Sequence, residues 1–383
     1  MSEALGTGEL LRLIESVFRP GDADRSLAIL VDLPDERLAD HTEWAARRAM
    51  AADWHAKLAA PGAAPGFDRI DLVYYRNARR NNADLPETAC IHFAGQLPDH
   101  AAQIDPSASL PFDEVFRQHR ILLAPTELSA TAPLKLNAPR YGFRAATMPG
   151  FTAEMIPALR LDYEEIHRRC VALKRRLDRA SAARIELEAA GERHTLLLDL
   201  RHREATASGG LVRTEGTAGN LPSGETYIVP YEGERDGDPS STCGTLPIEL
   251  QGELLVYRIE GNRVREVLGR GPVAERERAE VAAEPAYSNV AELGLGLLAD
   301  YGIHPIGQLL LDEKLGLHIA FGRSDHFGGT VGAADFSSPD KVVHIDRVYL
   351  PEVQPAVRVV SVDLEGDTGD EDPDPLMRDG RYV

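Results

Sequence analysis

The chain has 383 residues, 43% of them hydrophobic, and a formal net charge of −19. This length predicts two globular domains, or one large one, that bury a core without help from disulfides. The strong negative charge disfavours nucleic acid and anionic membranes as partners, because their phosphate groups would be repelled.

The first half of the chain alternates segments of strand character with segments of helix character. In chain order these are residues 27–31 (strand), 36–59 (helix), 70–75 (strand), 90–94 (strand), 112–119 (helix), 121–124 (strand) and 163–182 (helix). Strands separated by helices favour a mostly parallel sheet with helices packed on its faces. We therefore expect an α/β N-terminal domain over residues 1–182.

The second half has a different texture, in which apolar and polar residues alternate strictly. The alternating segments are residues 184–188, 195–200, 250–259 and 357–364. This pattern is typical of half-exposed, largely antiparallel strands, and one helix is predicted around residues 289–301. We expect an α+β domain with a largely antiparallel sheet over residues 183–362. An acidic tail at 363–383 is predicted to be mobile or loosely packed.

The sequence also bears on where the protein is found. The N-terminus lacks the basic start and apolar core of a signal peptide. No run of about eighteen apolar residues predicts a membrane span. The three cysteines, Cys90, Cys170 and Cys243, are widely spaced and suit buried free thiols in a reducing compartment. We therefore expect a cytoplasmic protein without nucleic-acid or membrane partners.

Common catalytic signatures are absent. The sequence holds no P-loop, no Gly-x-Ser-x-Gly elbow and no HExxH motif. The Gly-x-Gly at residues 294–296 lacks the third glycine and the preceding strand of a dinucleotide site. These short signatures therefore indicate no function.

A histidine and an aspartate interrupt the apolar segment at residues 342–349. Residues two apart in a strand project from the same face, so we expect His344 and Asp346 to lie side by side. An imidazole and a carboxylate in this arrangement can bind one divalent ion or form a hydrogen-bonded pair. The spacing alone leaves both interpretations open.

Other polar residues of the second half lie in apolar surroundings, namely Glu225, Glu292 and His318. A single such glutamate is usually a cap or a salt-bridge member, and a single histidine is usually a core residue with its hydrogen bonds satisfied. Several in one domain favour a shared role, because each costs desolvation free energy unless it is paired or bound to a metal.

Short motifs follow one another in the second half: GNLPSGE at 219–225, AELGLG at 291–296, LDEK at 311–314 with HIA at 318–320, and HID at 344–346. In this order they resemble the motifs of the aminopeptidase T and aminopeptidase S family of metallopeptidases. Residues 144–150 and 162–163 resemble the family as well. The similarity thus runs from about residue 120 to about residue 350.

The resemblance implies a site with two divalent metal ions. By residue-to-residue correspondence, the ligands fall on Glu225, Glu292, His318, His344 and Asp346. Two cations about 3.5–4 Å apart lower the pKa of a shared water and polarise a scissile carbonyl. Mixed nitrogen and oxygen ligands suit zinc, cobalt, manganese or iron. The resemblance therefore implies a homodimeric metallohydrolase that cleaves an amide or peptide bond in a peptide or a specialised small molecule.

One position departs from the family pattern. Family members that cleave peptides carry a tyrosine seven residues after the first histidine, whereas this chain has Asp325 there, followed by His326. An aspartate cannot donate a proton at neutral pH unless its pKa is raised, so His326 is the natural candidate for a general acid or base. The alternative is that Asp325 and His326 only shape the polar, glycine-rich loop at 322–329.

Two other functions stay open. The 2,5-dihydroxypyridine dioxygenases resemble the same family and use one iron held by two histidines and a carboxylate, which His318, His344 and Asp346 could supply. Glu225 and Glu292 would then be redundant. The third interpretation is a catalytically inactive member that binds a small molecule or a partner protein, and the intact set of ligand residues argues against it.

Overall fold

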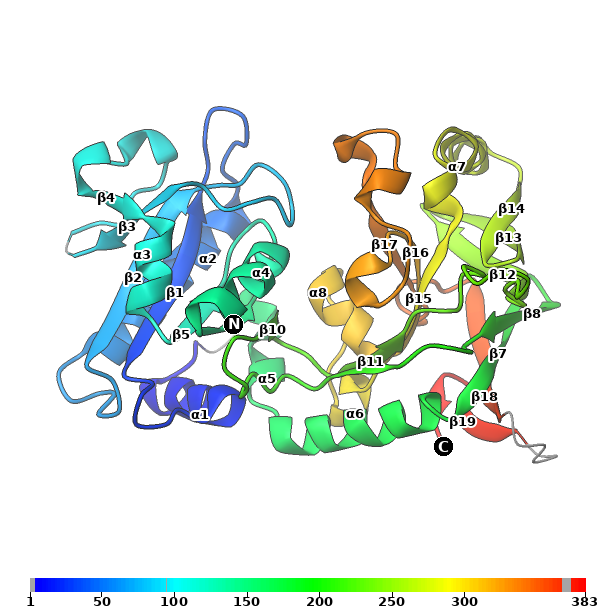
Figure 1. The fold of residues 1–383 in the computed structure, drawn as a ribbon, viewed down its shortest axis with the longest axis horizontal. Helices are drawn as coiled ribbons and strands as arrows, with labels where there is room; N and C mark the ends of the chain where they lie inside the picture. The colour runs from blue at the N-terminus through cyan, green and yellow to red at the C-terminus, as the bar shows by residue number, and fades with distance from the viewer. Residues whose placement is uncertain (1–3, 94, 367–372) are drawn as a thin grey trace. The chain divides into compact units, whose positions relative to one another are not determined.

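The computed structural model describes residues 4–93, 95–366 and 373–383 (Figure 1). The chain forms two compact units, the first built from Met1–His167 and Gly210–Ser223 and the second from Arg168–Gly209 and Gly224–Val383. The division falls within helix α6 (Tyr163–Leu177), not near residue 183 where the texture changes. The sequence pattern changes where a strand begins, whereas the two compact units are defined by contacts between residues of the folded chain.

A seven-stranded sheet forms the centre of the first unit, with the strand order β10–β6–β5–β1–β2–β3–β4 (Figure 1). In chain order the strands are β1 (Ser26–Leu33), β2 (Arg69–Arg76), β3 (Thr88–His92), β4 (Ser109–Pro111), β5 (Ile121–Ala124), β6 (Arg144–Thr147) and β10 (Ala218–Asn220). Pairing is parallel from β10 to β2 and antiparallel where β3 joins β2 and β4 joins β3. The expected mostly parallel sheet is confirmed. Strand β10 belongs to it because the segment 210–223 returns to pair with β6.

The α-helices of the first unit include the two predicted between its strands, at 36–59 and 112–119. They are α1 (Thr7–Phe18), α2 (Thr42–Ala59), α3 (Phe112–Gln118), α4 (Thr131–Tyr141) and α5 (Ile156–Leu159). Helix α2 begins six residues later than predicted, because Asp35 accepts the backbone N–H groups of Arg37 and Leu38 in a turn. The sequence does not predict α4, whose Pro139 and scattered apolar residues obscure a helical pattern.

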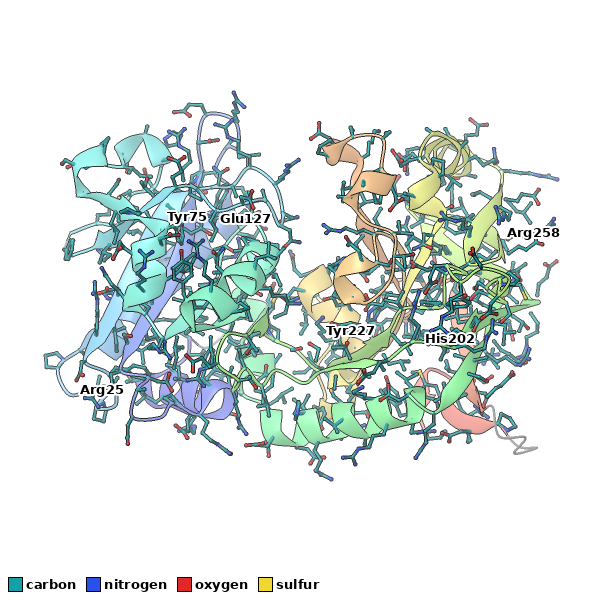
Figure 2. All side chains as sticks on the ribbon, viewed as in Figure 1. Arg25, Tyr75, Glu127, His202, Tyr227 and Arg258 are labelled. Carbon is teal, nitrogen blue, oxygen red and sulfur yellow. The ribbon has the colours of Figure 1, made fainter. Side chains whose placement is uncertain are left out.

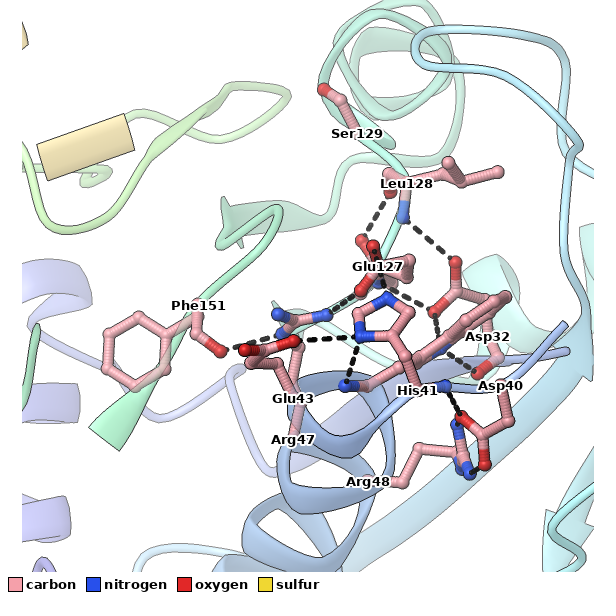
Figure 3. Close-up of polar contacts among 12 residues, drawn as sticks. Asp32, Asp40, His41, Glu43, Arg47, Arg48, Glu127, Leu128, Ser129 and Phe151 are labelled. Atoms are coloured by element: carbon pink, nitrogen blue, oxygen red, sulfur yellow. Dashed lines mark hydrogen bonds and ion pairs between the residues drawn. The ribbon is translucent and has the colours of Figure 1, made fainter. Parts of the chain in front are cut away.

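Asp32 is a fully buried carboxylate near the end of β1 (Figure 3). It accepts hydrogen bonds from the backbone N–H groups of Glu127 (2.7 Å) and Leu128 (3.0 Å). The indole N–H of Trp44 in α2 donates to it as well, at 3.2 Å. Asp32 thus ties the segment after β5 to β1 and α2. Burial outweighs these donors and raises the pKa of Asp32 to about 6.

The raised pKa predicts a pH dependence of stability in the first unit. The folded state binds the Asp32 proton more tightly than the unfolded chain, so the contribution of Asp32 to the free energy of unfolding falls as pH rises. In Asp32→Asn this titration is absent. Between about pH 4 and pH 7, the free energy of unfolding of the wild type should therefore drop by about 2 kcal/mol relative to the variant.

Urea unfolding of both full-length proteins across this pH range checks the prediction. The two tryptophans of the chain, Trp44 and Trp54, lie in α2, so their fluorescence reports on the first unit. The prediction fails if the difference in the free energy of unfolding stays constant, or grows in favour of the wild type, as pH rises. Either result would show that the hydrogen-bond donors hold Asp32 ionised.

The second unit holds two antiparallel sheets. The five-stranded sheet has the order β17–β16–β15–β11–β9, and the eight-stranded sheet has the order β14–β13–β12–β8–β7–β18–β19–β20. Strands of the first are β9 (Thr206–Ser208), β11 (Glu225–Ile228), β15 (Val290–Gly296), β16 (Leu317–Gly322) and β17 (His344–Val348). Strands of the second are β7 (Ala180–Ala189), β8 (Glu192–Asp199), β12 (Cys243–Leu250), β13 (Glu253–Glu260), β14 (Arg263–Leu268), β18 (Val357–Gly366), β19 (Asp374–Arg378) and β20 (Arg381–Tyr382). The α-helices are the part of α6 from Arg168 onward, α7 (Pro272–Ala283) and α8 (Leu309–Asp312).

Two predictions for the second half are wrong. The helix expected around residues 289–301 is strand β15, which ends before a short 3-10 turn at Leu298–Tyr301. Both faces of β15 are buried, so the strand lacks the polar–apolar alternation that reveals strands elsewhere. The tail also differs from the expectation, since β19 pairs with β18 and β20 with β19, and Leu376 and Met377 of β19 are buried. Residues 367–372 of the predicted tail lie outside the described residues.

Other expectations concern the cysteines and the membrane. Cys90, Cys170 and Cys243 are free thiols, the first two buried. Within the described ranges, no helix combines the length and the apolar character needed to cross a membrane.

Candidate metal centre

The five predicted ligands lie on neighbouring strands of the five-stranded sheet. Glu225 begins β11, Glu292 lies in β15, His318 in β16, and His344 and Asp346 in β17. These strands follow one another in the sheet, as Figure 1 shows. Antiparallel pairing thus brings together side chains that are up to 121 positions apart in the sequence.

The five side chains form two overlapping groups that could each hold one ion. One group contains Glu225, Glu292 and His318, and the other contains Glu292, His344 and Asp346. The Nε2 atom of His318 lies 3.3 Å from Oε1 of Glu292, and Nε2 of His344 lies 3.2 Å from Oε2 of the same carboxylate. Ligands about 2.0–2.1 Å from a tetrahedral metal are roughly 3.3 Å apart. These donor atoms are therefore close enough to be ligands of a metal ion, and Glu292 belongs to both groups.

His344 and Asp346 meet as their two-residue spacing predicts, with Nε2 of His344 3.6 Å from Oδ1 of Asp346. The Nδ1 atom of His344 lies 2.7 Å from the backbone carbonyl of Arg323. An N–H donated to this carbonyl fixes the tautomer and leaves the Nε2 lone pair directed toward the carboxylates. This is the usual arrangement around a metal-binding histidine.

Gly294 and Gly296 of the AELGLG segment leave space for His318 and for the backbone of Lys314. A Cβ atom at Gly294 would lie 1.8 Å from Nε2 of His318, and one at Gly296 would lie 2.1 Å from the backbone of Lys314. Any other residue at position 294 would displace the imidazole. Steric crowding therefore explains why β15 has glycine at these two positions, and at position 294 the crowding atom belongs to a candidate ligand.

The charges of the site favour a cation. Burial disfavours a charge on His318, but Glu292, Glu225 and Asp346 overcome this effect and raise its pKa to about 9. The pKa of His344 is raised in the same way. The two histidines lower the pKa of Glu292, although burial opposes this effect. A divalent ion would compete with protons for both imidazoles.

Glu225 provides a test of whether the residues fit a metal. Its Oε2 atom is buried and has no hydrogen-bond partner among the described residues, yet it lies 3.7 Å from Nε2 of His318. An unpaired carboxylate oxygen inside a protein costs free energy unless a cation or donor binds it. The donor set and this unpaired oxygen fit a divalent metal.

Sequence reasoning did not single out two charged residues beside Glu225. Lys314 is 2% exposed, and its Nζ lies 2.5 Å from Oε1 of both Glu225 and Glu313. Burial and the charges of Asp346 and Glu225 raise the pKa of Glu313 to about 8, against the opposing effect of Lys314. The signal for both residues was the charged pair inside the apolar segment at 309–317.

Asp325 and His326 lie on a loop beside the ligands. Asp325 forms an ion pair with Arg323 at 2.6 Å, which holds the pKa of Asp325 low against partial burial. The ring of His326 lies 5.4 Å from that of His344 and 3.9 Å from that of Phe327. Desolvation and the positive charges of His344 and Arg323 lower the pKa of His326, so its imidazole is neutral at neutral pH. Catalytic roles for Asp325 and His326 stay predictions.

Aromatic rings line the same side of the site. Phe327 makes an edge contact with Tyr227 of β11, which Figure 2 labels, at a centroid distance of 4.8 Å. The Phe327 ring also lies 5.2 Å from the ring of His344. The loop therefore packs against a candidate ligand through its rings as well as through the carbonyl of Arg323.

Solved structures share this fold. The structure of a 2,5-dihydroxypyridine dioxygenase from Pseudomonas putida KT2440 matches with a TM-score of 0.59 at 16% identity, over 99% of this chain and 98% of that chain. AmpT (aminopeptidase T) from Thermus thermophilus matches with a TM-score of 0.52 at 16% identity, over 98% of this chain and 99% of that chain. Comparison of the sequence with protein-family models and with curated proteins gave no match. The chain therefore shares a fold, over nearly its whole length, with a dioxygenase and with aminopeptidase T.

Proposed function

We propose that this protein is a hydrolase that acts with two divalent metal ions, held by Glu225, Glu292, His318, His344 and Asp346. The observation that carries the proposal is the position of Glu292. Its two carboxylate oxygens lie close to different histidines, and each histidine belongs to a different group of potential ligands. A shared carboxylate between two groups is the arrangement that a two-metal site requires. The likeness to aminopeptidase T supports the same proposal.

The proposed reaction is cleavage of an amide or peptide bond in a small or specialised substrate. When bound, two such ions supply an activated water and a Lewis acid for the carbonyl. Lys314 holds Glu225 in place through their ion pair. Glu313 also binds Lys314 and so helps to hold the ammonium beside Glu225. His326 in its neutral form can accept a proton or a hydrogen bond from the substrate.

The role of His326 gives a prediction that separates catalysis from metal binding. His326→Ala should keep its metal content, because His326 belongs to neither ligand group. Turnover of amide substrates should fall by about 10²–10⁴-fold, the range expected for loss of a general acid or base. His304→Ala, at an exposed histidine of the same unit, is the matched control and should have full activity. Full activity in His326→Ala would limit His326 to shaping the loop.

A dioxygenase with a single iron is the second candidate function. The fold likeness to the 2,5-dihydroxypyridine dioxygenase favours it, and His318, His344 and Asp346 are the two histidines and one carboxylate that such an iron needs. Against it, the two histidines fall into different ligand groups. Metal analysis distinguishes the candidates, since the dioxygenase requires one iron and the hydrolase two ions. A homodimer remains a proposal based on the resemblance.

A further inference from the structure

Glu232 is a buried carboxylate in the segment that follows β11, and it is not one of the candidate ligands. Its side chain is 3% exposed. Its Oε1 accepts hydrogen bonds from the Ser324 hydroxyl (2.5 Å) and the Asn289 side-chain amide (2.8 Å). Its Oε2 accepts from the Thr330 backbone N–H (2.6 Å), the Thr330 hydroxyl (2.7 Å) and Arg203 (3.4 Å). These donors compensate the cost of burying the charge.

The contacts close one loop at its base, namely residues 324–330. Ser324 at its start and Thr330 at its end bind the same carboxylate. The backbone N–H of Ser324 donates to Val331 at 2.9 Å, and that of Val331 donates to the Ser324 hydroxyl at 3.2 Å. A Cβ atom at Gly329 would lie 2.2 Å from the same hydroxyl. The ends of the loop are therefore packed tightly around Glu232.

The loop reaches the candidate metal centre in two ways. It carries the rings of His326 and Phe327, which lie 5.4 Å and 5.2 Å from the ring of His344. The residue just before it, Arg323, accepts the hydrogen bond from Nδ1 of His344. Any shift of Ser324 is passed along the backbone to this carbonyl and changes the orientation of the imidazole.

We propose that Glu232 is a positioning residue that fixes the 324–330 loop and, through it, the orientation of His344 at the metal centre. The part that concerns His344 rests on the proposed function. Loss of a group that holds a metal ligand in its orientation typically lowers metal affinity by about 10–100-fold. Glu232 acts through Ser324 and Arg323, so we expect an effect at the lower end of this range.

The test compares full-length wild type with Glu232→Gln. Glutamine has the shape of glutamate, but an NH₂ group replaces one carboxylate oxygen. This group faces the hydrogen-bond donors on its side of Glu232 and cannot accept hydrogen bonds from them. The backbone amides of Thr330 and Val331 should exchange hydrogen roughly 10-fold faster, because the hydrogen bonds that close the loop are weakened. In a Co²⁺ titration followed by visible absorption, the Kd should rise about 10-fold and the spectrum of the bound ion should shift.

Two further variants make the outcomes decisive. Thr330→Val removes one donor at an exposed position, carries little risk to folding and should change exchange and Co²⁺ binding in the same direction by a smaller amount. Asp363→Asn alters a partly buried carboxylate that binds Arg378 between β18 and β19 of the second unit, and it should change neither property.

Unchanged exchange in both Glu232→Gln and Thr330→Val would overturn the proposal. Fast exchange with an unchanged Co²⁺ spectrum and affinity would refute the positioning of His344. The same changes in Asp363→Asn would reduce the effect to general destabilisation. If the wild type binds no Co²⁺, the proposed function fails, while the exchange comparison still decides whether Glu232 fixes the loop.

Discussion

Glu292→Gln is expected to remove both metal ions from the protein. The glutamine keeps the volume of Glu292 but offers one neutral oxygen in place of two charged ones, so both ligand groups lose their common member. Metal affinity should fall by more than about 100-fold, the upper end of the loss found for residues that only support a ligand. Equilibrium dialysis followed by elemental analysis measures this directly.

Glu225→Ala is the comparison that tests the sharing of Glu292. It damages only the group formed with His318 and leaves Glu292, His344 and Asp346 intact. We therefore expect about one ion per chain in Glu225→Ala and close to none in Glu292→Gln. Asp363→Asn, the control variant used above, should keep the wild-type metal content. Equal losses in Glu225→Ala and Glu292→Gln would contradict two ions that share one carboxylate.

Lys314→Met is expected to destabilise the second unit strongly. It leaves the buried carboxylate of Glu225 without the ammonium that pairs with it. Removing one partner of a buried ion pair costs about 3–5 kcal/mol of unfolding free energy. Hydrogen exchange of the backbone amides of β15 and β16 in metal-free protein measures the loss, and added Zn²⁺ should restore part of it by supplying positive charge.

Lys174→Met provides the matched control for this prediction. Lys174 also bonds to two carboxylates, Asp178 and Glu204, but its side chain is 26% exposed. Partly exposed ion pairs contribute about 0–1 kcal/mol, so this variant should be nearly as stable as the wild type. Similar small effects of both substitutions would mean that the charge at Lys314 does not hold the candidate site together.

Local pattern predicted the parts of the fold in which one face of an element is polar. The alternation at residues 184–188 and 357–364 corresponds to strands β7 and β18, whose side chains alternate between buried and more exposed positions. Strand β15 was missed because it is buried on both faces and contains good helix formers. The return of β10 to the first unit could not be predicted, because it depends on pairing with a strand about 70 positions away.

Prediction of the candidate site from the sequence is limited to local geometry in the same way. Two-residue spacing is enough to place His344 beside Asp346, because strand geometry is local. Bringing Glu225 and His318 to them requires the order of strands in the sheet, which only the resemblance to a known family implied. Lys314 lies in the LDEK motif, but nothing local in the sequence predicts its place beside Glu225, and Glu232 belongs to no motif. Their positions depend on burial and on partners at distant points of the chain.

The number and kind of metal ions bound to the wild-type protein test the central claim most directly. Protein purified without added metal, handled without oxygen and examined by elemental mass spectrometry should contain about two zinc, cobalt or manganese ions per chain. Loss of these ions to a chelator should abolish hydrolysis of amide substrates. A single oxygen-sensitive iron per chain would contradict the two-metal hydrolase and support a dioxygenase at the same residues.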